Sequence, residues 1–207
     1  MMHKYVMEAL GTFFIALALC LTGNPIAIGL MFMSFTCVGA LVSGAHFNGA
    51  VSLAFFMHKK LSLHHLVGYI AAQTVGALLA MISFYLITEM PYAPEPMIEL
   101  PVWISMGMEA KLTFVLALVV MAMASHKMQS YTPAVRGFAN GLTLMGICYV
   151  GGLFNPSIAF AALAWGAVKG GTFATMSNFM IYGVGSLVGG AVASLVHTFF
   201  CSHTELR

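Results

Sequence analysis

The sequence predicts an all-α membrane protein with six transmembrane helices and two shorter re-entrant helices, arranged as two inverted repeats. Composition is the first reason, because 60% of the 207 residues are hydrophobic, only 7% are charged and the mean hydropathy is +0.94. The second is that six apolar runs approach the ~20 residues that a helix needs to cross a hydrocarbon core. The third is a short phrase that occurs twice, as Asn48-Gly49-Ala50 and as Asn155-Pro156-Ser157.

The six predicted spans cover, in chain order, residues 5–22, 25–43, 66–88, 102–125, 134–150 and 173–200. The first run follows Lys4 and has the outline of a signal peptide, but Glu8 interrupts it, so we expect a retained helix. Two apolar pieces remain, at residues 48–57 and 155–166, and each begins at an Asn. A segment of about ten residues is too short to span and is better interpreted as re-entrant.

The two halves of the chain resemble each other beyond this phrase. Met7-Glu8-Ala9 in the first predicted helix matches Met108-Glu109-Ala110 in the fourth. Each half holds three spanning helices, an odd number, so the second half must be inserted upside down relative to the first. We therefore expect a single channel domain over residues 1–207, made of inverted repeats at approximately 1–100 and 101–207, with a shared site near the midplane.

Charge and cysteine patterns exclude several classes of protein. The formal net charge of +2 gives no basic surface of the kind that binds nucleic acid. The four cysteines lie singly, without the paired spacing of a disulfide scaffold or a metal site. Because the chain shows no nucleophile–base–orienter set and no metal-ligand spacing, we expect no enzyme, no catalytic residue, no cofactor and no metal.

Basic residues set the expected orientation. If the helices alternate, six of them fall on one side of the membrane: Lys4, Lys59, Lys60, Lys127, Arg136 and Arg207. Lys169 falls on the other side, so the positive-inside rule places both termini in the cytoplasm. The short termini and the lack of a targeting segment fit a multi-pass protein of a bacterial inner membrane, with a eukaryotic endomembrane left open. Membrane lipid is then a partner, which His58, Lys59 and Lys60 would face at the headgroups.

The chemistry of the paired Asn residues points to a pore. A half-helix starts with N–H groups that lack partners, and its dipole is equivalent to roughly +0.5 charge at that end. An Asn side-chain carbonyl accepts from the helix start while its NH2 donates into a pore. Two such ends at the midplane repel cations, and a water held by both Asn48 and Asn155 is a poor link in a proton-conducting chain. Either Asn alone would be an ordinary cap, as expected for Asn24-Pro25, but the repeated pair indicates a channel.

On these motifs the chain resembles the aquaporin and glycerol-facilitator superfamily, the major intrinsic proteins, over essentially its whole length. The matching runs are Glu8–Phe13, Ser43–Ala54, Tyr69–Ala77, Glu109, Asn155-Pro156 and Tyr182–Ala191. The resemblance implies an aquaporin-like right-handed bundle and a homotetramer with one pore per subunit. It also implies that Glu8 and Glu109 accept hydrogen bonds from the backbone leading into the half-helices, with His46 and Gln73 as further structural support. A relay or ligand role is the alternative for His46.

Departures from the family pattern bear on selectivity. Gly49 stands where the family carries Pro, which predicts a looser start of the first half-helix, and Ser157 replaces Ala. Ile158 stands where most members carry an Arg that narrows the outer pore and donates hydrogen bonds. Carried over by spacing, the outer constriction consists of Ile28, Cys148, Gly152 and Ile158. This set is uncharged, and we expect it to be wider than a filter built with Arg and aromatic residues.

We therefore expect a passive channel for water and small uncharged solutes, with glycerol, urea, ammonia and hydrogen peroxide all open. A constriction with few hydrogen-bonding groups excludes ions through the cost of dehydration. Three alternatives remain: a strictly water-selective channel, a proton or cation leak, and a non-conducting membrane scaffold whose apolar constriction stays dry.

Overall fold

The computed structural model describes residues 1–94, 100–125, 132–169 and 173–204, and the regular structure of this part of the chain is helical. The elements are α1 (Met2–Thr22), α2 (Pro25–Gly39), α3 (Gly49–Met57), α4 (Leu63–Thr88), α5 (Val102–Met123), α6 (Pro133–Cys148), α7 (Pro156–Lys169), α8 (Met176–Asn178), the π-helical η2 (Phe179–Gly185) and α9 (Ser186–Thr204). The predicted all-α class is confirmed.

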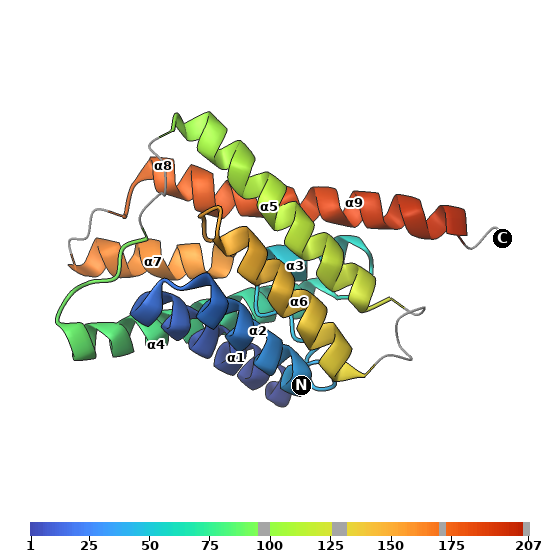
Figure 1. Cartoon of the computed structure of the whole chain (residues 1–207), viewed down its shortest axis with the longest axis horizontal. Coiled ribbons are helices and arrows are strands. Elements are labelled where there is room, and N and C mark those ends of the chain that lie inside the picture. The colour runs from blue at the N-terminus through green and yellow to red at the C-terminus, as the bar shows by residue number, and fades with distance from the viewer. Residues whose placement is uncertain (95–99, 126–131, 170–172, 205–207) are drawn as a thin grey trace.

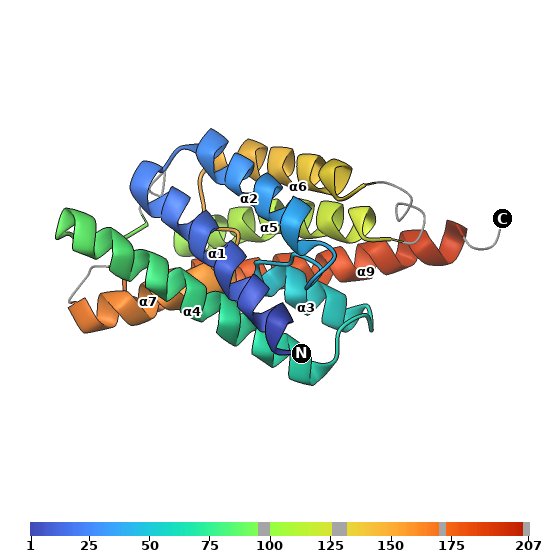
Figure 2. The ribbon, with the colours of Figure 1, turned by 90° about the horizontal axis from the view of Figure 1, so that it is seen from below.

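The two halves of the chain have the same order of elements (Figure 1). A long helix, a shorter helix, a half-helix and a second long helix occur as α1 to α4, and again as α5, α6, α7 and the continuous α8–η2–α9 segment. Helix α1 packs along α4 and α5 packs along α9, while α2 and α6 pair across the halves. The half-helices α3 and α7 both contact α4 and extend toward opposite ends of the molecule in Figure 2.

The spanning helices differ in length. Four segments of the described chain are long and apolar enough to cross a membrane: Met2–Thr22, Leu63–Thr88, Val102–Met123 and Met176–Cys201. Helices α2 and α6 are shorter, with 15 and 16 residues. The predicted end of the second span at residue 43 is wrong, because the chain turns after Gly39, whose carbonyl accepts from the N–H groups of Ser43 and Gly44.

The last spanning segment is not a uniform α-helix. It begins at Met176 instead of the predicted residue 173, and Phe179–Gly185 form a π-helical stretch before α9 starts. Such a stretch inserts residues into a helix and shifts the faces that follow it. A Cβ on Gly185 would lie 2.9 Å from the Met106 carbonyl oxygen, so this part of the segment lies directly against α5.

The half-helices are too short to cross a bilayer. Helix α3 has 9 residues and α7 has 14. At 1.5 Å per residue these are roughly 14 and 21 Å long, less than the ~30 Å of a hydrocarbon core. Their first residues follow Asn48 and Asn155, whose exposed fractions are 3% and 5%, so both helix starts lie inside the protein.

Glycines at matching positions of the two halves let the long helices touch backbone to backbone. A Cβ on Gly76 of α4 would lie 2.1 Å from the Ala9 carbonyl oxygen of α1. A Cβ on Gly189 of α9 would lie 2.3 Å from the Ala110 carbonyl oxygen of α5. Ala9 and Ala110 directly follow the two buried glutamates, so these contacts position corresponding residues in each half.

The contact at Gly76 predicts that Gly76→Ala lowers the stability of the folded protein by about 1–3 kcal/mol, because the added methyl meets backbone that cannot move aside cheaply. The measurement is the thermal unfolding midpoint of the purified protein in detergent. Gly146→Ala in α6 is the matched control, since an added Cβ there meets nothing within 4 Å. An equal loss in both variants would contradict this explanation.

Candidate functional site

Two asparagines cap the half-helices where they meet. The Asn48 Oδ1 atom accepts from the backbone N–H groups of Ala50 at 2.8 Å and Val51 at 3.4 Å. The Asn155 Oδ1 atom accepts from the N–H of Ser157 at 3.1 Å. Each cap satisfies donors that a helix start leaves unpaired, which matters most where water is scarce.

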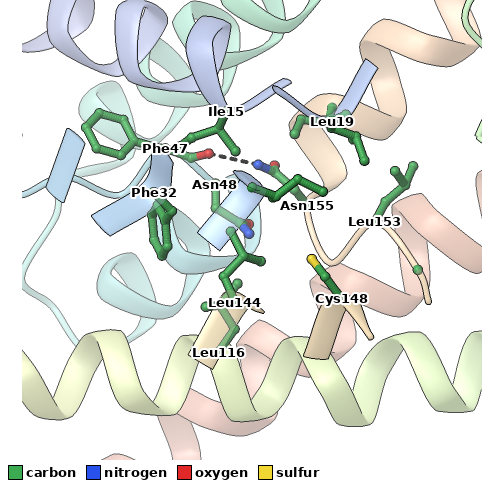
Figure 3. A pocket seen from close by; sticks show the side chains of 13 residues that line it. Ile15, Leu19, Phe32, Phe47, Asn48, Leu116, Leu144, Cys148, Leu153 and Asn155 are labelled. Carbon is green, nitrogen blue, oxygen red and sulfur yellow. Dashed lines mark hydrogen bonds between the residues drawn. The ribbon is translucent and has the colours of Figure 1, made fainter. Parts of the chain in front are cut away.

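The same two side chains bond across the junction between the halves. The Asn48 Nδ2 atom donates to the Phe154 carbonyl oxygen at 2.7 Å, and the Asn155 Nδ2 atom donates to the Phe47 carbonyl oxygen at 2.8 Å. Figure 3 shows the second of these bonds beside Asn48. An amide NH2 has two hydrogens, so each Asn keeps one N–H that can point into the adjoining cavity.

The residues that accept these bonds have an unusual backbone conformation. Phe47 and Phe154 have φ values of 49° and 54°, in the left-handed region that a bulky residue avoids. Such a conformation costs about 1–2 kcal/mol and needs surrounding bonds to hold it. The Phe47 N–H donates to Glu8 at 2.6 Å, and the Phe154 N–H donates to Glu109. Each Phe is thus held at its N–H by its own half and at its carbonyl by the other half.

Glu8 accepts hydrogen bonds from two segments, the loop between α2 and α3 and helix α4. Its Oε1 atom accepts from the Ser43 hydroxyl at 2.6 Å and from the His46 N–H at 3.0 Å. Its Oε2 atom accepts from Phe47 and from the Gln73 Nε2 atom, the latter at 2.8 Å. The carboxyl is fully buried, so this arrangement matches the support of the pre-helix backbone that the resemblance implies.

Glu109 has the same position in the second half, with a partner that the sequence reasoning missed. It accepts from the N–H groups of Leu153 at 3.3 Å and of Phe154, and from the Ser186 hydroxyl at 2.9 Å. Ser186 replaces Gln73, as the alignment of Gln73-Thr-Val-Gly76 with Ser186-Leu-Val-Gly189 could have indicated.

Gln73 connects the two half-helices. Its Nε2 atom donates to Glu8 and to the Ser52 hydroxyl at 3.1 Å, and its Oε1 atom accepts from the Ser157 hydroxyl at 2.9 Å. His46 joins the same network through Nδ1 and the Ser52 hydroxyl, 3.2 Å apart, and its ring lies 4.4 Å from that of Phe55. His46 is 3% exposed.

The two departures from the repeated phrase touch each other. A Cβ on Gly49 would lie 2.7 Å from the Ser157 hydroxyl oxygen and 3.1 Å from Pro156 Cγ. The absence of a side chain at position 49 therefore leaves room for the Ser157 hydroxyl. We predicted a looser start for the first half-helix than for the second. The caps do not show this difference, because the Asn48 side chain accepts two hydrogen bonds from backbone N–H groups and the Asn155 side chain accepts one.

A mostly apolar cavity of about 30 Å³ borders both asparagines (Figure 3). All four residues expected at the constriction line it: Ile28, Cys148, Gly152 and Ile158. The larger side chains around it include Phe32, Leu116, Leu144 and Leu153. A cavity of this size holds about two waters. None of its described lining residues is charged.

Tyr92, between α4 and α5, is a second residue that the sequence reasoning missed, since nothing in its loop marks it. Its ring lies edge-on to Phe84 at 5.9 Å and packs against the cluster that contains Leu153 and Ile158. Burial raises the pKa of the Tyr92 hydroxyl, and the nearby Cys20, Tyr182 and Cys148 side chains raise it further. Tyr92 therefore packs against a cluster that includes two residues of the cavity lining.

This arrangement can select against charge without binding an ion. The starts of α3 and α7 direct two positive dipole ends at the centre, and the apolar lining offers little to replace an ion's hydration. Among the residues that the structure describes, no group of three His, Cys, Asp or Glu side chains is arranged to hold a metal ion.

Comparison with known proteins agrees with the geometry. The major intrinsic protein family matches residues 10–197. The chain belongs to the major intrinsic protein family. The lens fiber major intrinsic protein of Lithobates pipiens is 32% identical over 185 residues, covering 84% of this chain and 67% of that protein. Aquaporin TIP1-2 of Musa acuminata is 29% identical over 186 residues, covering 86% and 70%.

The fold is also that of a solved family member. The aquaglyceroporin from Plasmodium falciparum superposes with a TM-score of 0.84 over 100% of this chain and 99% of that one, at 21% identity. This major intrinsic protein is thus a multi-pass integral membrane protein and a passive channel for water and small solutes, not an enzyme. The predicted aquaporin-like fold is confirmed.

The contact between Gly49 and Ser157 makes a prediction about this pair. Gly49→Ala should lower the unfolding midpoint in the natural background, because the new methyl displaces a hydroxyl that Gln73 holds. In a Ser157→Ala background the same change should cost less, with a coupling of about 0.5–3 kcal/mol in a double-mutant cycle followed by thermal unfolding. Strictly additive effects would show that the two positions are independent.

Proposed function

We propose that the constriction formed by Ile28, Cys148, Gly152 and Ile158 selects small uncharged solutes by their cost of dehydration, so that glycerol, urea, ammonia or hydrogen peroxide can pass as well as water. The observation that carries this proposal is the joint placement of these four residues around one cavity with Asn48 and Asn155. The polar side-chain groups at this point are then the two amides and a thiol.

Ions are excluded by two effects that act in the same region. An ion entering this lining loses hydration that Ile, Leu and Phe side chains cannot replace, which costs many kcal/mol for a charged group. Cations also meet the positive ends of α3 and α7. An uncharged solute escapes both penalties and keeps the free N–H of each Asn as a hydrogen-bond donor.

Selectivity for water alone is not expected, because Ile158 offers no donor that would favour water over a larger neutral solute. The lining is instead mostly apolar and includes large side chains such as Phe32 and Leu153. Solutes with a low free energy of dehydration should therefore pass fastest.

The assembly and the location follow from the same proposal. We place residues 1–207 as one channel domain with repeats at approximately 1–100 and 101–207, four copies forming a homotetramer in a bacterial inner membrane. Helix α1 begins and α9 ends toward the same end of the molecule (Figure 1), which supports placing both termini in the cytoplasm. Apolar side chains exposed on the long helices, such as Val75 and Leu195, would face lipid or neighbouring subunits.

The experiment that tests the function is stopped-flow light scattering on proteoliposomes, with water, glycerol, urea, ammonia and hydrogen peroxide each measured against empty liposomes. We expect several neutral solutes to move faster than through lipid alone. A water-to-glycerol ratio far above that of lipid, with no other solute accelerated, would indicate a strictly water-selective channel. No acceleration of any solute would indicate a non-conducting scaffold.

The presence of Ile158 where most family members carry an Arg leads to a prediction. Ile158→Arg should lower glycerol and urea permeability about tenfold, since a long charged side chain narrows the cavity and binds the waters within it. Ile158→Leu keeps the volume nearly constant and is the control. The same stopped-flow assay applies, with both variants required to elute like the natural protein in size-exclusion chromatography. Unchanged permeability in the Arg variant would place residue 158 outside the conduction path.

Cys148 makes a further prediction, because its half-buried thiol lines the cavity. A mercurial that binds this sulfur should block most of the solute flux, and Cys148→Ser should conduct in its presence. Cys37→Ser is the control, since Cys37 lies where a Cβ on Gly137 would touch it, between α2 and α6. Inhibition that persists in the Cys148 variant and disappears in the Cys37 variant would contradict the prediction.

A further inference from the structure

Helices α2 and α6 carry three buried polar atoms for which the described residues provide no hydrogen-bond partner. They are the Thr36 Oγ1 atom, the Asn140 Oδ1 atom and the Arg136 Nε atom. Thr36 is fully buried and Asn140 is 2% exposed, while Arg136 is half-buried. An unpaired polar group inside an apolar bundle is costly, so these atoms require a partner that the described residues do not supply.

The two helices that carry them run antiparallel in almost direct backbone contact. A Cβ on Gly29 would lie 2.7 Å from the Gly141 carbonyl oxygen, and a Cβ on Gly141 would lie 2.7 Å from that of Gly29. A Cβ on Gly137 would lie 2.7 Å from the Met33 carbonyl oxygen. These contacts fix the face of each helix that meets the other helix. The face beside it on each helix then borders the pore.

The unpartnered atoms continue the row of pore-lining residues. On α2 the cavity is lined by Ile28 and Phe32, and Thr36 follows four residues later. On α6 it is lined by Cys148 and Leu144, and Asn140 precedes Leu144 by four residues. Residues four apart lie on one helix face. Phe32 and Leu144 stand next to Asn48 in Figure 3, so Thr36 and Asn140 lie just beyond the paired asparagines, toward the end of α2 and the start of α6.

Arg136 extends this group by one further turn of α6. Its guanidinium adds donors to the acceptor of Asn140 and to the hydroxyl of Thr36. Together the three side chains offer both donors and acceptors, with Thr36 and Asn140 one turn beyond the cavity and Arg136 a further turn along α6.

We propose that Thr36, Arg136 and Asn140 form a binding station in the inner half of the pore for a small neutral solute that carries neighbouring O–H or N–H donors and an acceptor oxygen, as glycerol and urea do. The inference rests on the proposed function, because the station lies on the same conduction path. Asn140 accepts from a hydroxyl or amide N–H, Thr36 donates or accepts, and Arg136 donates to the solute oxygen. The solute regains here part of the hydrogen bonding that it lost in the apolar cavity.

The test uses Asn140→Leu and Thr36→Val, which replace each polar side chain by an apolar one of similar shape. Glycerol and urea uptake into proteoliposomes should fall about threefold to tenfold in each variant, as expected for one lost hydrogen bond. The unfolding midpoint should stay the same or rise, because neither variant breaks a bond within the described protein.

Thr113→Val is the matched control. The Thr113 Oγ1 atom is also buried without a described partner, but this residue packs against Gly189 where α5 contacts α9, on neither of the two helices that carry the station. Its solute uptake should equal that of the natural protein. Natural-level uptake of both solutes in Asn140→Leu and Thr36→Val would overturn the station alone. A natural protein that conducts neither glycerol nor urea would also overturn the station, and one that accelerates no neutral solute at all would overturn the proposed function with it.

Discussion

Two reciprocal hydrogen bonds, from Asn48 to the Phe154 carbonyl and from Asn155 to the Phe47 carbonyl, hold the centre of this molecule. Two half-helices that start inside an apolar bundle leave backbone groups that lipid cannot satisfy. The Asn side chains satisfy them within each half through Oδ1 and between the halves through Nδ2. Because Glu8 and Glu109 hold the same Phe residues by their N–H groups, the long helices α1 and α5 are connected to the pore centre through one residue each.

The two halves share this plan and differ where their sequences differ. Gln73 reaches both Glu8 and the Ser157 hydroxyl, so the first half also holds the second half-helix. Ser186 is shorter and reaches Glu109 alone among the side chains of the second network. Gly49 and Ser157 are best understood together, since the missing side chain at one leaves room for the hydroxyl at the other. The departures from symmetry thus compensate one another.

In the permeation path that we propose, apolar and polar surroundings alternate. The cavity around Ile28 and Ile158 gives a solute few hydrogen bonds, the paired asparagines give one N–H each, and the face that carries Thr36 and Asn140 gives more. A neutral solute tolerates such a sequence because each apolar stretch is short. An ion does not tolerate this path, because it loses its hydration in the same region where the positive ends of the half-helices repel cations.

The sequence by itself determined the membrane class, the helix order, the inverted repeat and the paired Asn motif, because hydropathy and repeated phrases are local properties of a chain that must satisfy its own backbone in lipid. It also indicated Glu8, Glu109 and Gln73 as supports, because polar residues in apolar helices need partners. Only the tertiary structure decided that α2 stops at Gly39, that residues 179–185 form a π-helix, that Ser186 bonds to Glu109, and that Gly49 faces Ser157. These features depend on how close two distant segments approach, and that distance is set by packing across the fold, which no local pattern records.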